Sequence, residues 1–150
     1  MNTEKTFVML KPTTISRGMV GNILTRLENK GLKIVAMKML QVSQEKANAL
    51  YAVHKGKPFY EELVNYIMSG PIVALVVEGQ GAVSIIRKLI GKTNPKEAEP
   101  GTIRGDYAMT VTKNAIHASD SVENAKTEMS IFFASEEIVN YKRADEQWLY

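Results

Sequence analysis

Only two histidines occur in the chain, and one of them, His117, stands among residues that could support nucleophilic chemistry. It lies within residues 114–121, just past an apolar stretch, where a strand is expected to give way to a helix. Such an edge holds a side chain rigidly while exposing it, and a helix N-terminus favours anions. Glu128 follows eleven residues later, about three helical turns on, so its carboxylate could fold back to orient the imidazole. The spacing therefore permits a histidine nucleophile paired with a carboxylate.

Two glycine-containing segments look like phosphate-binding motifs, and neither fits. Gly91-Lys92-Thr93 lacks the glycine that a P-loop places five residues before its Gly-Lys pair, because that position is Ile86. Gly79-Gln80-Gly81 begins like a dinucleotide fingerprint, but Ser84 stands where the third glycine belongs. A tight turn is the preferred interpretation of the second segment. A dinucleotide-dependent oxidoreductase built on it is the rival hypothesis from another class of enzyme.

Five short segments occur in one order along the chain, and together they resemble nucleoside diphosphate kinase. The resemblance extends from about Thr6 to Tyr150. Its most specific part is the pair of segments at residues 100–106 and 114–121. The segments are FVMLKP at residues 7–12, SGP at 69–71, GKTNP at 91–95, PGTIRGD at 100–106 and NAIHASDS at 114–121.

The resemblance implies an α/β (α+β) fold, a ferredoxin-like sandwich in which helices cover a four-stranded antiparallel sheet. It implies one nucleoside diphosphate kinase domain over residues 1–150 and a phosphotransferase that uses nucleoside triphosphates and diphosphates. The γ-phosphoryl group would move reversibly from one to the other by a ping-pong mechanism through phosphorylated His117, with broad base specificity. Histidine is an accepted covalent nucleophile, and a two-step reaction lets one site serve donor and acceptor in turn.

Positions that match the family's motifs carry implied catalytic roles. His117 would attack through Nδ1, and Glu128, helped by Ser119, would hydrogen-bond the other ring nitrogen. Lys11 would reach the transferring phosphate and, together with Asn114, the 3′-hydroxyl of the sugar. The implied catalytic residues are His117, Glu128, Lys11, Ser119 and Tyr51, which would lie beside the nucleophile.

A second set of positions would bind the nucleotide. Arg104 and Arg87 would neutralise the phosphates, as phosphoryl transfer depends on positioning and on cations near the equatorial oxygens. Thr93 would donate a hydroxyl group, while Phe59 and Val111 would lie on the two faces of the base. The implied nucleotide-binding residues are Lys11, Phe59, Arg87, Thr93, Arg104, Val111, Asn114 and, as a further candidate, His54.

Magnesium is the implied cofactor. It would arrive with the nucleotide and be held mainly by phosphate oxygens and water, so that no residue is assigned as a metal ligand.

The chain departs from the family's usual pattern at three places: Thr13-Thr14 follows Lys-Pro where Asp-Gly is common, and Thr112 and Ala118 replace glycines. Loss of glycine narrows the allowed backbone around the proposed nucleophile. A catalytically weak nucleotide-binding module on the same fold is a second rival, and it would not need His117.

Hydrophobic patterning predicts the elements that must position these residues. The glycine- and proline-rich residues 91–105 show no periodicity and are expected to form an irregular loop. Periodicity alone leaves open a doubly wound parallel sheet and a split βαβ sheet with helices on one face. Strands are predicted at 6–10, 34–42, 72–77 and 107–111, and helices at 20–27, from Ser43 through Tyr51, at 59–70, at 83–90, and from a capping box at Asp120 to Phe132.

The composition indicates one globular domain, since the chain has 150 residues of which 45 % are hydrophobic. The absence of cysteine excludes disulfides and thiolate metal sites. The longest apolar run, 71–77, falls far short of the roughly 20 residues that cross a bilayer. We therefore expect a soluble cytoplasmic protein with no membrane partner. The net charge of +3 is spread along the chain, which argues against nucleic acid as the primary partner.

We also expect a homo-oligomer, a hexamer in preference to a tetramer. An antiparallel sheet with helices on one face would leave edge strands exposed, and proteins usually cover such edges. A C-terminal tail like residues 147–150 and a proline-bearing loop like Asn94-Pro95 resemble those of hexameric family members. Trp148, the only tryptophan, would then lie against a neighbouring subunit.

Overall fold

Strand β1 (Thr3–Leu10) lies at the centre of the sheet because residues 6–10 are buried on both sides. The computed structural model describes residues 2–150 and orders the four strands as β2-β3-β1-β4, with every neighbouring pair antiparallel. β3 (Ile72–Gln80) pairs with β1 along its whole length, while β2 (Lys33–Leu40) and β4 (Ile116–Ala118) form the edges. This order confirms the antiparallel sheet and excludes the doubly wound parallel alternative.

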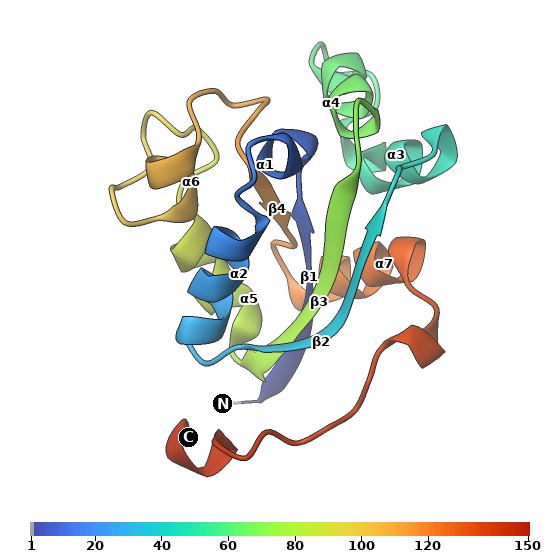
Figure 1. The fold of residues 1–150 in the computed structure, drawn as a ribbon. Helices are drawn as coiled ribbons and strands as arrows, with labels where there is room; N and C mark the ends of the chain where they lie inside the picture. Colours follow the sequence, from blue (N-terminus) through green and yellow to red (C-terminus); the bar gives the residue numbers. More distant parts are fainter. Residues whose placement is uncertain (1) are drawn as a thin grey trace.

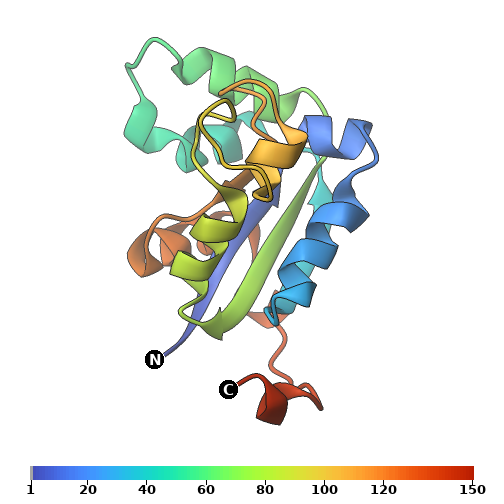
Figure 2. The same ribbon diagram turned by 90° about the vertical axis from the view of Figure 1, so that its left-hand side faces the viewer.

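Helices cover both faces of the sheet, as Figure 1 shows and Figure 2 shows from the side of α5. Phe7 and Met9 point into one core and Val8 and Leu10 into the other, as alternation along a strand requires. The alternative with helices on one face is therefore wrong, while the ferredoxin-like sandwich is confirmed. The first face packs on α3 (Gln44–Leu50), α4 (Tyr60–Met68) and α7 (Val122–Phe132), and the second on α2 (Val20–Asn29), α5 (Ala82–Ile90) and α6 (Ile103–Tyr107).

The fourth strand is not where the sequence pattern predicted it. Residues 107–111 are rich in strand-forming types, but Tyr107 ends α6 and the following residues form no strand. Met109 and Val111 are 77 % and 49 % exposed, so their apolar side chains do not pack into either core as those of a strand in the sheet would. The hydroxyl of Thr102 accepts from the backbone N–H of Gly105 and caps α6, which also shortens the loop predicted over 91–105. β4 lies further on and contains His117 itself.

Two further differences concern helix starts. Ser121, not Asp120, caps α7, because its hydroxyl accepts from the backbone N–H of Asn124. A short helix, α1 (Pro12–Ser16), follows β1 without having been predicted, with Pro12 in its first turn. The other predicted helices and strands are present with shifted ends, and one-turn helices η1 (Ala52–His54), η2 (Ser135–Glu137) and η3 (Glu146–Trp148) connect them.

The C-terminal segment leaves α7 and returns to the far end of the sheet (Figure 1). The Tyr141 hydroxyl donates to the backbone carbonyl of Ile34, and Nζ of Lys33 lies 2.9 Å from a carboxylate oxygen of Glu146. Trp148 is 81 % exposed at the end of this segment. No helix in residues 2–150 is long and apolar enough to cross a membrane.

Candidate active site

A cavity of about 540 Å³ is bounded by the end of β1, by β4, by α7 and by the α3–α4 hairpin. Ser119 does not line it, but is buried and contacts Glu128 from behind. All the other predicted site residues line this cavity: Lys11, Tyr51, His54, Phe59, Arg87, Thr93, Arg104, Val111, Asn114, His117 and Glu128. Side chains more than a hundred residues apart in the chain are thus brought to one place.

The ring of His117 is held from one side. β4 fixes the backbone through pairing with Met9 of β1. Nε2 of the imidazole lies 2.6 Å from Oε1 of Glu128, and the Ser119 hydroxyl donates to the same carboxylate oxygen over 2.8 Å. With Nε2 engaged as a donor to the carboxylate, Nδ1 is the ring nitrogen that keeps a lone pair. The site therefore offers an imidazole whose tautomer and orientation suit nucleophilic attack.

Two buried cationic side chains, Lys11 and Arg104, line the same cavity as this ring, and each is only 4 % exposed. Nζ of Lys11 donates to Oδ1 of Asn114 over 2.7 Å, while Arg104 donates to the backbone carbonyls of Ile116 and Gly91. Burial, and then the charge of Arg104, lower the pKa of Lys11 to about 7. Burial and the charge of Arg87 lower the pKa of Arg104 to about 10. None of their hydrogen bonds is to a carboxylate, so the cluster is suited to an anion.

Two buried polar atoms of cavity-lining residues lack a hydrogen-bond partner within residues 2–150: Nε of Arg104 and the hydroxyl of Tyr51. An unsatisfied buried polar group costs about 1–3 kcal/mol, so a ligand that supplied an acceptor or donor would gain from it. Burial is also the main reason that the pKa of Tyr51 is raised, so its hydroxyl stays protonated and able to donate. The edge of its ring faces His117, with centroids 6.5 Å apart.

The mouth of the cavity is apolar and more open. Phe59, just before α4, is 43 % exposed, and its ring lies edge-on to His54 with centroids 5.3 Å apart. Val111 lines the cavity from the loop between α6 and β4. Burial, and then the charges of Lys57 and His117, lower the pKa of His54, so the imidazole is more readily neutral. These side chains can enclose a flat, uncharged group.

Carboxylates are scarce in the cavity, where only Asp120 and Glu128 line the wall. Glu128 is engaged by His117, and Asp120 accepts from the side chain of Asn124. Within residues 2–150 no group of three or more His, Cys, Asp or Glu side chains could hold a metal ion. This donor set fits a magnesium ion that brings most of its oxygen ligands with it, because Mg²⁺ commonly binds through one or two carboxylates plus substrate phosphates. Sequence reasoning gave Asp120 a helix-capping role and no role in the site, although it lies within the 114–121 motif.

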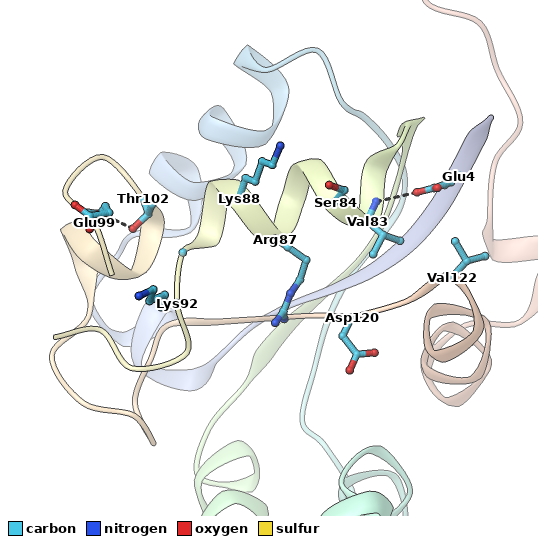
Figure 3. Close-up of a pocket in the computed structure, with 11 residues that line it drawn as sticks. Glu4, Val83, Ser84, Arg87, Lys88, Lys92, Glu99, Thr102, Asp120 and Val122 are labelled. Carbon is cyan, nitrogen blue, oxygen red and sulfur yellow. Dashed lines mark hydrogen bonds between the residues drawn. The ribbon is translucent and has the colours of Figure 1, made fainter. Parts of the chain in front are cut away.

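A second, open depression of about 770 Å³ shares Arg87 and Asp120 with this cavity, and Figure 3 shows the residues that line it. Arg87 extends from α5 toward Asp120, and its guanidinium donates to the backbone carbonyl of Ala118 over 3.3 Å. Lys88 points away from that pair. The three basic residues of the depression, Arg87, Lys88 and Lys92, are matched by three acidic ones, Glu4, Glu99 and Asp120. Its charges are therefore balanced, unlike those of the cavity around His117.

Comparison with known proteins gives consistent matches over nearly the whole chain. The sequence model of the family described as nucleoside diphosphate kinase matches residues 4–138. A nucleoside diphosphate kinase of Archaeoglobus fulgidus is 56 % identical over 147 residues, which cover 98 % of this chain and 97 % of that protein. One of Staphylococcus epidermidis is 51 % identical over 147 residues, covering 98 % and 99 %.

Solved structures agree with these sequence matches. A halophilic nucleoside diphosphate kinase from Halobacterium salinarum, in complex with CDP, superposes with a TM-score of 0.96 at 44 % identity, covering 99 % of both chains. The Aquifex aeolicus nucleoside diphosphate kinase superposes with a TM-score of 0.88 at 40 % identity, covering 92 % of this chain and all of that one.

Proposed function

The chain belongs to the nucleoside diphosphate kinase family, a family of phosphotransferases, and from this we propose that it moves the γ-phosphoryl group between nucleotides through phosphorylated His117. The observation that carries the proposal is the imidazole held at Nε2 by Glu128 in a cavity that two buried cations also line. Neither rival hypothesis calls for this arrangement. A purely nucleotide-binding module has no use for an oriented nucleophile, and an oxidoreductase has no use for a histidine–carboxylate pair at this place.

In the first half of the reaction, Nδ1 of His117 attacks the γ-phosphorus of a nucleoside triphosphate. A nitrogen–phosphorus bond forms, the bond from phosphorus to the β,γ-bridging oxygen breaks, and a nucleoside diphosphate leaves with that oxygen. Glu128 accepts a hydrogen bond from Nε2–H throughout, so positive charge that develops on the ring is stabilised. In the second half, a terminal phosphate oxygen of another nucleoside diphosphate attacks that phosphorus: an oxygen–phosphorus bond forms, the nitrogen–phosphorus bond breaks, and Nδ1 regains its lone pair. One site serves both halves, which is a ping-pong mechanism.

The buried cations would stabilise the charge on the transferring group. Arg104 presents an unpartnered Nε, and Lys11 presents an ammonium group whose hydrogen bond goes to a neutral amide. An added phosphate would raise the affinity of Lys11 for its proton, since its pKa of about 7 reflects burial and the positive charge of Arg104, which a phosphate would offset. Arg87 and Thr93, which line the same cavity, would hold the remaining phosphates. Cationic stabilisation of this kind is the main means of catalysing phosphoryl transfer.

Magnesium would be held mainly by phosphate oxygens and water, with Asp120 as the lining carboxylate able to contact its water shell. When bound, the ion supplies charge neutralisation on the phosphates. At the other end, Phe59 and Val111 would enclose the base by apolar contact, and such contact reads no base edge. Broad base specificity is therefore part of the proposal. The Halobacterium salinarum relative binds CDP, which supports binding of nucleoside diphosphates by this chain.

The direct test is incubation with radiolabelled ATP–Mg²⁺ and no acceptor. We expect stoichiometric labelling of the protein, with the acid lability and base stability of a phosphoramidate on imidazole. Adding a nucleoside diphosphate should discharge the label into triphosphate. A labelled protein that cannot be discharged, or no label at all, would contradict the proposal. A thermal-shift comparison of ATP–Mg²⁺ with NAD tests the oxidoreductase hypothesis in the same preparation.

Replacing Asn114 by alanine tests the assignment of the sugar contact. Asn114 pairs with Lys11 through Oδ1 and lines the cavity, so its loss should remove a contact to the 3′-hydroxyl of the nucleotide. We expect the rate with an ordinary acceptor to fall by about tenfold, the equivalent of one lost hydrogen bond, and the rate with a 3′-deoxy acceptor to change much less. Steady-state rates on both acceptors measure the difference, and equal losses would show the assignment to be wrong.

We further propose that the chain assembles as a homo-oligomer, a hexamer in preference to a tetramer. β2 is an edge strand whose Met37 and Met39 side chains are more than half exposed, and Trp148 is exposed as well, so apolar surface is left uncovered in one chain. Light scattering at micromolar concentration should give a mass several times 16.7 kDa. A mass of 16.7 kDa would rule the assembly out, and four times that mass would favour the tetramer.

A further inference from the structure

Ala115 adopts a strained backbone conformation directly before the strand that carries His117. Its φ is 75°, and it is the one non-glycine residue with positive φ in residues 2–150. The backbone N–H of Ile116 donates to the carbonyl of Asn114 over 2.9 Å, which closes a γ-turn around Ala115. γ-turns with positive φ at the central residue are rare and strained. The surrounding contacts must therefore hold this turn in place.

The turn sets the distance between groups of the active site. Asn114 precedes it, and its side chain bonds Nζ of Lys11 and the backbone carbonyl of Thr93. Ile116 follows it, and its carbonyl accepts from the buried Arg104. His117 is the next residue. A change in the turn would therefore shift the nucleophile relative to the residues that would bind the sugar and the phosphates.

One side chain outside the proposed catalytic set braces this turn. The hydroxyl of Thr14, in α1, donates to the carbonyl oxygen of Ala115 over 2.8 Å, and the side chain is only 2 % exposed. The backbone N–H of Lys11 donates to the same oxygen over 2.9 Å. The Ala115 carbonyl thus accepts two hydrogen bonds, and one of them comes from a side chain outside the proposed catalytic set.

We propose that Thr14 is a positioning residue for the phosphoryl transfer, acting through the strained turn at Ala115. The inference rests on the proposed phosphohistidine mechanism. Thr14 does not itself line the cavity, so the effect of its side chain is on geometry: the hydroxyl holds the Ala115 carbonyl, and with it the spacing of Asn114 and His117. Sub-ångström misplacement of a reacting group lowers the rate of transfer more than it lowers binding.

The test measures single-turnover phosphorylation by ATP–Mg²⁺ and, separately, nucleotide affinity. Thr14→Val keeps the shape and removes the hydroxyl, and we expect phosphorylation of His117 to slow by about tenfold, the equivalent of one buried hydrogen bond. Nucleotide affinity should stay within about twofold. Thr14→Ser keeps the hydroxyl and should restore the wild-type rate. Thr14→Ala serves in the same comparisons if the valine variant melts well below the wild type.

The decisive comparison uses Ala115→Gly as a background. Glycine takes positive φ without strain, so the turn no longer needs its brace, and adding Thr14→Val should then change the rate by no more than about twofold. Thr13→Val is the matched control, because the neighbouring hydroxyl contacts Tyr66 instead of the turn. An equal loss from Thr14→Val in both backgrounds, or a serine variant as slow as valine, would overturn the inference. Failure of the wild type to label on histidine would instead overturn the mechanism on which it rests.

Discussion

Replacing His117 by alanine is expected to abolish both phosphoenzyme formation and turnover, a loss on the order of 10⁴-fold or more, as when other covalent nucleophiles are removed. Within residues 2–150, His117 is the histidine that pairs with a carboxylate. Nucleotide binding should survive, because Arg104, Thr93 and Phe59 are untouched and line the same cavity. The variant should fold, since the His117 side chain is partly exposed and contributes little to either core.

The measurement is labelling by ATP–Mg²⁺ together with calorimetric binding of a nucleoside diphosphate. His54→Ala is the matched control, since it removes the other histidine of the cavity and should leave the acid-labile label in place. Ser119 and Ser121 are the competing acceptors by position. An acid-stable label, or any label that persists in the alanine variant at position 117, would refute the assignment of the nucleophile.

Glu128→Gln is expected to slow phosphoenzyme formation on the order of a hundredfold while leaving nucleotide affinity nearly unchanged. The carboxylate accepts from Nε2 and thereby keeps the lone pair on Nδ1. An amide can also donate to Nε2, which would place the proton on Nδ1 and block its attack. Ser119 donates to the same oxygen of Glu128, so the geometry around the amide is held while its electrostatics change.

Stopped-flow single-turnover kinetics can separate this effect from binding. Glu123→Gln is the matched control, because Glu123 lies on the same helix and is exposed to solvent. If the variants at 123 and 128 phosphorylate at the same rate, then Glu128 does not orient the ring. If glutamine at 128 weakens nucleotide binding as much as it slows transfer, its role is structural.

Elements with a strong pattern were predictable from the sequence, and short ones were not. β1 and β3 are central strands buried on both faces, and they appear in the sequence as continuous apolar runs. β4 spans only three residues, which is too short to show a hydrophobic pattern in the sequence. It is held in the sheet by its pairing with β1. The residues at 107–111 have the composition of a strand but find no partner, since Thr102 caps α6 immediately before them.

The candidate site was predictable as a set of residues and not as an arrangement. The sequence motifs identified the cationic side chains, the imidazole of His117 and the side chains proposed to enclose the base. The structure brings all of these to one cavity. Burial of Lys11 without a carboxylate partner could not be inferred from the apolar residues around it, because its partner, Asn114, comes 103 residues later. The contact of Thr14 with Ala115 was equally hidden, since it depends on a backbone carbonyl that only the γ-turn exposes.

The two ends of the cavity differ in how deeply their side chains are buried. The phosphate end is formed by Lys11, Arg104 and Asn114, each no more than 4 % exposed, so we expect the amide hydrogens around them to exchange slowly. The base end is formed by the α3–α4 hairpin at the end of the sheet (Figure 1), where Phe59 is largely open to water. We expect the exposed tip of that hairpin, around Phe59, to open locally more readily than the phosphate end. Since a ping-pong enzyme must release one nucleotide and admit another in every cycle, the weaker end is the natural exit, and base dissociation would set the residence time of each nucleotide.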